Sequence, residues 1–185
     1  VTHDGADLRE YDPRAWRGRT GLVLQEDYLF AGTVRENLVM GREDVTEESL
    51  ARAIEMSSCG RIIDNLEGGL EGEVAERGAT FSTGERQLLA IARALAADPA
   101  LVILDEATAS VDSATEAAIE EATRNLLKGR SALVVAHRLS TIRRADEILV
   151  LHHGHAATIR LAAPGIFFSC RCDDGSQLRG AGAAR

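Results

Sequence analysis

The chain has 185 residues, 45% of them hydrophobic, which is enough to bury the core of one ordinary domain. Its net charge of −8 and its single lysine, Lys128, disfavour a nucleic-acid surface. No apolar run approaches the roughly 18 residues of a membrane span, and the few cysteines lack metal-ligand spacing, so we expect a soluble segment in a reducing compartment. Since the first residue is Val1 and not methionine, we also expect an incomplete amino terminus.

The first third of the chain alternates short strands and helix starts. An Asp-Gly turn within Val1 to Arg9 predicts a short hairpin. Gly21 to Leu24 reads as a brief apolar strand that ends in Gln25. Thr33 to Leu38 resembles a helix start, and Thr46 is placed to cap a second helix. From about residue 35 to residue 97 the pattern is mostly helical, which predicts a helical insert in a sheet protein.

A loop opens onto a helix at Ser82. Glu85 follows three residues later, the spacing of a capping box, and apolar residues then recur at helical spacing until Pro99. The backbone N–H groups near Ser82 to Gly84 would offer an anion site at the start of this helix. Taken alone, the same pattern is better explained as a plain helix cap, because such boxes are common.

Two further strands are predicted on either side of a helix. Leu101 to Leu104 is apolar on both faces, which is typical of a buried parallel strand. Ser113 and Glu116 form a capping box for the next helix, and Ala132 to Ala136 is the second strand. Such a βαβ unit has parallel strands. A last strand, Ile148 to Leu151, follows a short helix from Ser140.

Polar side chains follow three of these strands. Asp105 and Glu106 end one, His137 ends another and Gln25 ends a third, so the parallel arrangement places all four at one sheet edge, where open α/β sheets bind ligands. Asp105 would bind Mg²⁺, Glu106 would polarise a water, Gln25 would position water and metal, and His137 would hydrogen-bond a γ-phosphate. Each residue taken alone has a structural explanation, a loop start or a hydrogen-bonded histidine, and only their shared edge favours phosphoryl transfer.

These residues resemble the motifs of one family. Over roughly residues 1–154 the sequence is similar to the ATPase domain of ATP-binding cassette (ABC) transporters. Phe81 to Glu85 resembles the family's signature segment, Leu101 to Glu106 its Walker B strand, and Ser110 to Asp112 its D-loop. His137 matches the switch histidine and Gln25 the Q-loop glutamine. The implied fold class is α/β, a P-loop NTPase-like and mostly parallel sheet with a helical subdomain at about 35–97 and a core of 1–34 and 98–154.

The resemblance implies a function for the site as well. ATP with Mg²⁺ would be the cofactor, with Asp105 and Gln25 toward the metal. Two such domains would sandwich two ATP molecules, as a homo- or heterodimer, with the partner's nucleotide touched by residues of the signature segment and D-loop: Ser82, Thr83, Gly84, Glu85 and Asp112. Leu29 to Leu38 and Glu73 to Gly78 look like the exporter branch, where they face the transmembrane domain at the cytoplasmic side of the membrane.

Two stretches depart from the family. No G-x-x-x-x-G-K-[ST] phosphate cradle (Walker A) occurs in the 185 residues, so the fold would lack its amino-terminal strands and P-loop, and we expect this segment alone to be inactive as an ATPase. Residues 155–185 have neither glutamate nor lysine and are rich in alanine, glycine and arginine, which predicts a frameshifted or unstructured tail.

Three functions stay open at this point. The first is the ATP-hydrolysing domain of an exporter. The second is a catalytically defective interaction module that donates its signature segment to a complete subunit. The third, a soluble ABC ATPase of DNA repair, would require long coiled coils that the sequence does not contain, and the acidic charge also argues against it.

Overall fold

A computed structural model describes residues 2–3, 5–24, 28–105, 111–136, 145–152, 155–160, 167–172 and 177–181. The chain divides into two compact units, Val1–Val135 and Ala136–Arg185. Within the described residues, none of the helices combines the length and apolarity that crossing a bilayer requires.

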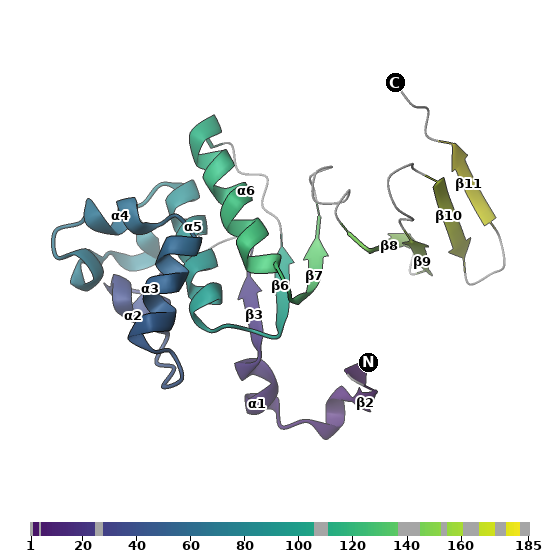
Figure 1. Ribbon diagram of the computed structural model, residues 1–185, viewed down its shortest axis with the longest axis horizontal. Coiled ribbons are helices and arrows are strands. Elements are labelled where there is room, and N and C mark those ends of the chain that lie inside the picture. The colour runs from purple at the N-terminus through teal and green to yellow at the C-terminus, as the bar shows by residue number, and fades with distance from the viewer. Residues whose placement is uncertain are drawn as a thin grey trace. The chain divides into compact units, whose positions relative to one another are not determined.

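The first unit is built around a parallel sheet (Figure 1). Its strands are β3 (Thr20–Val23), β6 (Leu101–Asp105) and β7 (Ser131–Val135), in the order β3-β6-β7, and both pairings are parallel. Helix α6 (Ser113–Leu127) connects β6 to β7. The predicted buried strands and their parallel βαβ arrangement are therefore confirmed.

The two faces of this sheet differ in burial. Val23, Val102 and Leu104 alternate onto one face and belong to the buried core, which also contains the inner sides of α6 and of α5 (Thr83–Ala96). On the other face Leu133 is 58% exposed, and Leu22, which shares its row, is about as exposed. Parallel sheets are normally covered on both faces, so this one presents an apolar face without cover among the described residues.

The helical part lies between β3 and β6 in sequence, as predicted. After the short strand β4 (Gly32–Thr33) come α2 (Val34–Val39), α3 (Glu47–Met56), α4 (Gly60–Asp64), η2 (Gly69–Glu71), β5 (Glu73–Val74) and η3 (Glu76–Gly78), and then α5. Thr33 and Thr46 cap α2 and α3 with their side chains, as their positions in the sequence predict. The apolar positions of α5 are buried along its length, so this helix is the centre of the core.

The amino-terminal residues form the predicted hairpin. β1 (Thr2–His3) pairs antiparallel with β2 (Ala6–Asp7), and Gly5 turns the chain with a φ of 83° that favours glycine. The 3₁₀ turn η1 (Leu8–Glu10) and helix α1 (Pro13–Gly18) lead from it to β3.

The second unit contains an antiparallel sheet of order β11-β10-β9-β8. Its strands are β8 (Glu147–His152), β9 (His155–Arg160), β10 (Phe167–Cys172) and β11 (Gln177–Ala181). β8 is the predicted strand at Ile148 to Leu151, whereas the short helix predicted from Ser140 lies outside the described residues. The other three strands occupy much of residues 155–185, whose origin in another reading frame stays a prediction.

Candidate nucleotide site at the sheet edge

The carboxyl ends of the three parallel strands lie next to one another. Val23 at the end of β3 is paired with Leu104, and Asp105 at the end of β6 is paired with Val135 at the end of β7. The predicted residues Gln25, Glu106 and His137 follow these ends within two positions, but all three lie outside the described residues. The edge predicted from the sequence is thus present, and the placement of the three side chains on it stays a prediction.

Asp105 is the one predicted metal ligand that the structure describes. Its side chain is half-buried at the end of β6, beside the ends of both neighbouring strands. A carboxylate at a strand end is the hard oxygen ligand that Mg²⁺ prefers, so the residue fits the implied ion. Among the described residues no three acidic, histidine or cysteine side chains gather closely enough to hold a metal. Gln25, the other predicted metal ligand, lies outside the described residues and stays a prediction.

The signature segment Phe81 to Glu85 begins helix α5 with the predicted capping box. The Ser82 N–H donates to Glu85 Oε2 (2.8 Å), and the Glu85 N–H donates to Ser82 Oγ (3.2 Å). The carboxylate of Glu85 is therefore engaged within the chain. Ser82 and Thr83 remain exposed at the positive end of a 14-residue helix, which is a favourable position for an anion.

Gly84 has a packing role in this segment. A Cβ placed on it would overlap Thr115 Cγ2 and lie 3.3 Å from Val111 Cγ1. The first turn of α5 therefore approaches the start of α6 more closely than any other residue type allows. Gly84 holds the signature segment against Val111 and Thr115 at the start of α6.

Asp112, predicted to contact the partner's nucleotide, is the N-cap of α6. Its carboxylate accepts hydrogen bonds from the N–H groups of Ala114 and Thr115 (3.0 Å each) and from Thr115 Oγ1 (2.6 Å). The Thr115 donors hold the pKa of Asp112 below its usual value. The predicted cap by Ser113 with Glu116 was wrong by one residue, because an aspartate directly before the helix offers two acceptor oxygens to the free N–H groups. The contact of Asp112 with the partner's nucleotide stays a prediction.

The two segments that resemble the exporter branch lie side by side. Tyr28, Leu29 and Phe30 form what we name the docking loop. Tyr28 and Phe30 are nearly half exposed, with ring centroids 4.9 Å apart, whereas Leu29 is fully buried. A Cβ on Gly78, at the end of η3, would lie 2.8 Å from Leu29 Cδ1, so the loop is anchored on the segment that precedes the signature. The pairing of β4 with β5 joins the same two parts of the chain.

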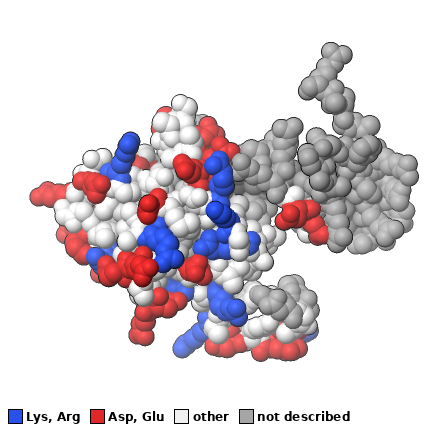
Figure 2. Space-filling model, in the orientation of Figure 1, with Lys and Arg blue, Asp and Glu red and all other residues white. Residues whose placement is uncertain are grey.

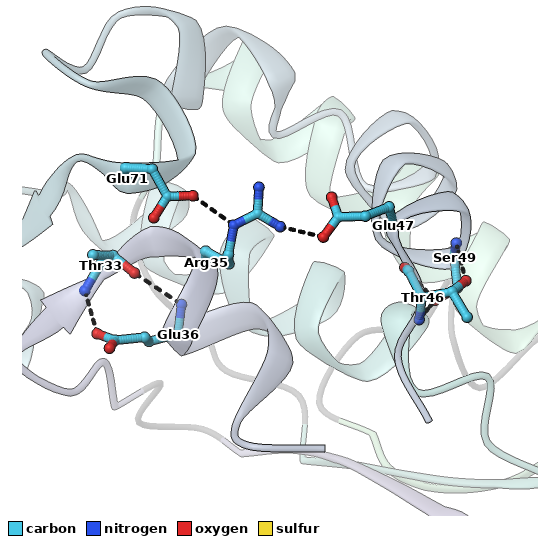
Figure 3. A network of polar contacts seen from close by, with 7 residues as sticks. All are labelled: Thr33, Arg35, Glu36, Thr46, Glu47, Ser49 and Glu71. Atoms are coloured by element: carbon cyan, nitrogen blue, oxygen red, sulfur yellow. Dashed lines mark hydrogen bonds and ion pairs between the residues drawn. The ribbon is translucent and has the colours of Figure 1, made fainter. Parts of the chain in front are cut away.

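Arg35 joins three elements of the helical part (Figure 3). Its Nε donates to Glu71 Oε1 in η2 (2.5 Å), and its Nη1 donates to Glu47 Oε1 at the start of α3 (2.6 Å). Both carboxylates raise the pKa of Arg35. The Val34 N–H also donates to Gly72 O (3.1 Å), so the start of α2 is bound both to the last residue of η2 and to the residue that follows it.

Two positioning residues escape prediction from the sequence. Asn37 on α2 is buried, and its side chain binds both backbone groups of Phe30. Arg93 on α5 donates to Asn37 O (2.8 Å) and to Tyr28 O (3.1 Å). The only sequence signal is that Asn37, a polar residue, stands among the apolar positions of α2. No local pattern relates position 37 to position 93.

Lys128 lies far from the nucleotide edge. It is the exposed C-cap residue of α6 and precedes β7, so it sits at the amino end of the sheet. The five residues of β7 span about 16 Å at roughly 3.3 Å per residue, which separates Lys128 from the edge that carries Asp105. The single lysine of the chain is therefore not placed to bind a phosphate there.

Surface charge is mixed on the face drawn in Figure 2, where acidic and basic side chains alternate and many acidic ones lie over the helical part. Acidic and basic groups also pair directly, as Arg42 does with Asp44 and Arg130 with Asp98 (2.7 and 2.6 Å).

A family model of the ABC transporter matches residues 1–109. The chain belongs to the ABC transporter family. It is 46% identical over 151 residues to an uncharacterized ABC transporter ATP-binding protein, YknV, of Bacillus subtilis, covering 82% of this chain and 25% of the relative. It is also 46% identical over 154 residues to a probable multidrug resistance ATP-binding/permease protein, YheH, of the same organism, covering 83% of this chain and 23% of the relative.

A solved structure shows the same fold. A bacterial Atm1-family ABC exporter with ATP bound superposes with a TM-score of 0.71 at 36% identity, over 82% of this chain and 26% of that one. The α/β, P-loop NTPase-like fold predicted from the sequence is therefore confirmed. Of these similar proteins, YheH is named as an ATP-binding/permease protein and the solved structure is an ABC exporter. The chain spans about a quarter of the length of these relatives.

Proposed function

We propose that this chain is the ATP-hydrolysing part of an ABC exporter that works in a pair with a second ATPase domain and drives a transmembrane domain. The observation that carries the proposal is the junction of three parallel strand ends at Asp105, with a capped signature segment at the start of the buried helix α5. The similarity of the chain to an ATP-binding/permease protein and to an ABC exporter agrees with this function.

The residues divide the chemistry between the two domains. Asp105 would hold Mg²⁺ and Glu106 would take a proton from the attacking water, while Gln25 and His137 would orient the water and the γ-phosphate. When bound, Mg²⁺-ATP supplies the phosphoryl group and the charge that these residues stabilise. Ser82 and Thr83 are exposed at the positive end of α5 and would meet the phosphates of the partner's nucleotide.

The test uses a longer protein that contains this segment, its upstream phosphate cradle and its membrane domain. We expect ATP hydrolysis that falls by about 10² to 10⁴-fold in Glu106→Gln, the range for a lost general base. Glu116→Gln, a change on the adjoining helix α6, is the matched control and should hydrolyse ATP like the parent protein. Equal activity of the Glu106 variant and the parent would refute the proposed site.

We also propose that the 185 residues alone do not hydrolyse ATP above background. The lysine that a phosphate cradle requires has no candidate near Asp105, because Lys128 lies at the opposite end of the strands. The apolar face of the β3-β6-β7 sheet, which the described residues leave without cover, is consistent with a layer supplied by a further segment. Hydrolysis by the purified chain that disappears in Glu106→Gln would contradict this.

A second candidate function is a module that lends its signature segment to a complete subunit. The capping box of Ser82 with Glu85 and the close packing of Gly84 favour it, because residues of this chain alone hold the segment in place. Mixing this chain with a complete ATPase domain whose own signature serine is replaced tests it. Restored hydrolysis that is lost again with Ser82→Arg would support the module, and no restoration would exclude it.

A further inference from the structure

We propose that Asn37 and Arg93 are positioning residues that bind the docking loop Tyr28 to Phe30 to the signature helix α5, so that loop and helix move as one body. The inference rests on the proposed function for its consequence in transport, but the tie itself is a property of this chain. It goes beyond the motifs, because Arg93 belongs to none of them and Asn37, although it lies in Leu29 to Leu38, has no role assigned to it by that resemblance.

The tie begins at Asn37, which is only 3% exposed. Its Oδ1 accepts from the Phe30 N–H (2.8 Å), and its Nδ2 donates to Phe30 O (2.8 Å) and to Thr33 O (3.0 Å). One buried side chain therefore satisfies both the N–H and the C=O group of Phe30. A buried amide with all these partners fixes a single loop conformation, since any other would leave polar groups unpaired.

The second half of the tie is Arg93, three turns into α5. Its Nε donates to Asn37 O (2.8 Å), and one Nη2 group donates to Tyr28 O (3.1 Å) and approaches Asn37 Oδ1 at 3.5 Å. The planar guanidinium thus bridges α2 and the loop with donors in a fixed fork. Lysine has no such fork, so it cannot replace these contacts together.

A third contact ties the loop to Gly78, which precedes the same helix. Leu29 is fully buried, and its side chain lies where a Cβ on Gly78 would meet it. The same position is 3.1 Å from Cδ of Arg86, whose Nη1 donates to Phe81 O (2.8 Å). The loop is therefore held both near the signature segment and farther along α5.

The consequence is mechanical. The exposed rings of Tyr28 and Phe30 are the part of the loop that a membrane domain would contact, and Ser82 is the part of α5 that a partner's nucleotide would contact. Hydrogen bonds join the loop to Arg93, and helix α5 leads from Arg93 to Ser82. Hydrogen-bond networks and rigid helices are elements that can carry coupling between distant sites. Movement of α5 when a nucleotide binds would then displace the rings without a change within the loop.

Hydrogen exchange on this chain tests the tie. We expect Arg93→Lys to speed exchange of the Phe30 amide at least tenfold relative to amides in the middle of α5. The Phe30 amide bonds to Asn37 and not to Arg93, so the effect has to pass through the tie. Arg52→Lys is the matched control, because Arg52 only pairs with Glu48 on the surface of α3, and it should leave Phe30 unchanged. An unchanged Phe30 in Arg93→Lys, or equal acceleration of all amides, would overturn the proposal.

Asn37→Ala is the second variant, with Asn125→Ala as its control, because Asn125 likewise donates from a helix to a backbone oxygen, that of Met56 (2.8 Å). We expect faster exchange throughout residues 28–33 in Asn37→Ala alone. Acceleration restricted to Phe30 itself would mean one lost hydrogen bond and no tie, and would count against the proposal.

In the longer exporter, Arg93→Lys should lower the substrate transported per ATP hydrolysed by about 5-fold or more, the lower limit of typical coupling between sites. An unchanged ratio would overturn the coupling role. A parent protein that hydrolyses no ATP would instead refute the proposed function, and the exchange result on Phe30 would still decide the tie.

Discussion

Gly84→Ala tests whether the signature segment is held by close packing. The backbone φ of Gly84 is not in the left-handed region, so alanine suffers no conformational strain there. The added methyl group would instead overlap Thr115 Cγ2. Thr115 cannot rotate away freely, because its hydroxyl donates to Asp112 Oδ2 (2.6 Å). The start of α6 would have to move, or Thr115 would lose that hydrogen bond.

The expected magnitude combines two opposing effects. Overpacking by one methyl group in a well-packed site costs about 1 to 3 kcal/mol. Replacing glycine by alanine in a helix returns up to about 1 kcal/mol, and less near the first turn. We therefore expect Gly84→Ala to lower the free energy of unfolding by about 1 to 2 kcal/mol.

Urea denaturation followed by circular dichroism at 222 nm measures this change, because the helices of the described residues all lie in the first unit. Gly18→Ala is the matched control: a Cβ there meets nothing within 4 Å, so stability should stay equal or rise. Thr115→Ser removes Cγ2 and keeps the hydroxyl. The double variant should therefore recover at least about 1 kcal/mol of the loss as a coupling free energy. Additive effects of Gly84→Ala and Thr115→Ser would refute the packing argument.

Three further predictions concern the same unit. The pKa of Asp112 lies below its usual 3.8, so its charge stabilises the fold above pH 3.8 and that contribution is lost as the pH falls through the lowered value. Asp112→Ala should therefore be less stable than the parent at pH 7, with the difference in urea midpoint shrinking in acid. Burial raises the pKa of Cys59, so maleimide labelling at Cys59, mapped by mass spectrometry, should require denaturant; labelling of the native chain would contradict it. Arg35→Ala should cost only about 0.2 to 1 kcal/mol and less at high salt, because Glu47 is 81% exposed, and a larger loss in urea titrations would show that the network is stronger than surface pairs.

Features that depend on neighbouring residues could be predicted from the sequence. The capping box of Ser82 with Glu85 was placed correctly, because both partners lie within one turn. The apolar run at β6 and its parallel partner β7 were also found, because a strand, a helix and a strand of that length allow little else. The edge at Asp105 followed directly from that topology.

Two kinds of feature could not be predicted from the sequence. One is which of two neighbouring residues caps a helix, and the other is a contact between residues far apart in the chain. Asp112 and Ser113 both suit an N-cap, and only the observed helix start, which gives the carboxylate two N–H donors, decides for Asp112. Asn37 and Arg93 are 56 positions apart, and their contact follows from how α2 packs on α5. Neither residue type predicts a role in holding a loop, since an asparagine in a helix or an arginine near its end is usually solvated.

The contacts that could not be predicted from the sequence also join the signature segment, α6 and the docking loop. α5 carries Ser82 at its start, meets α6 through Gly84 and meets the docking loop through Arg93. α5 also packs on the sheet, because a Cβ on Gly21 in β3 would lie 2.7 Å from Pro99 and 3.7 Å from Ala94. A helix with such fixed neighbours on several sides cannot bend to follow a ligand. A force on its exposed first turn must therefore move the helix and the docking loop together.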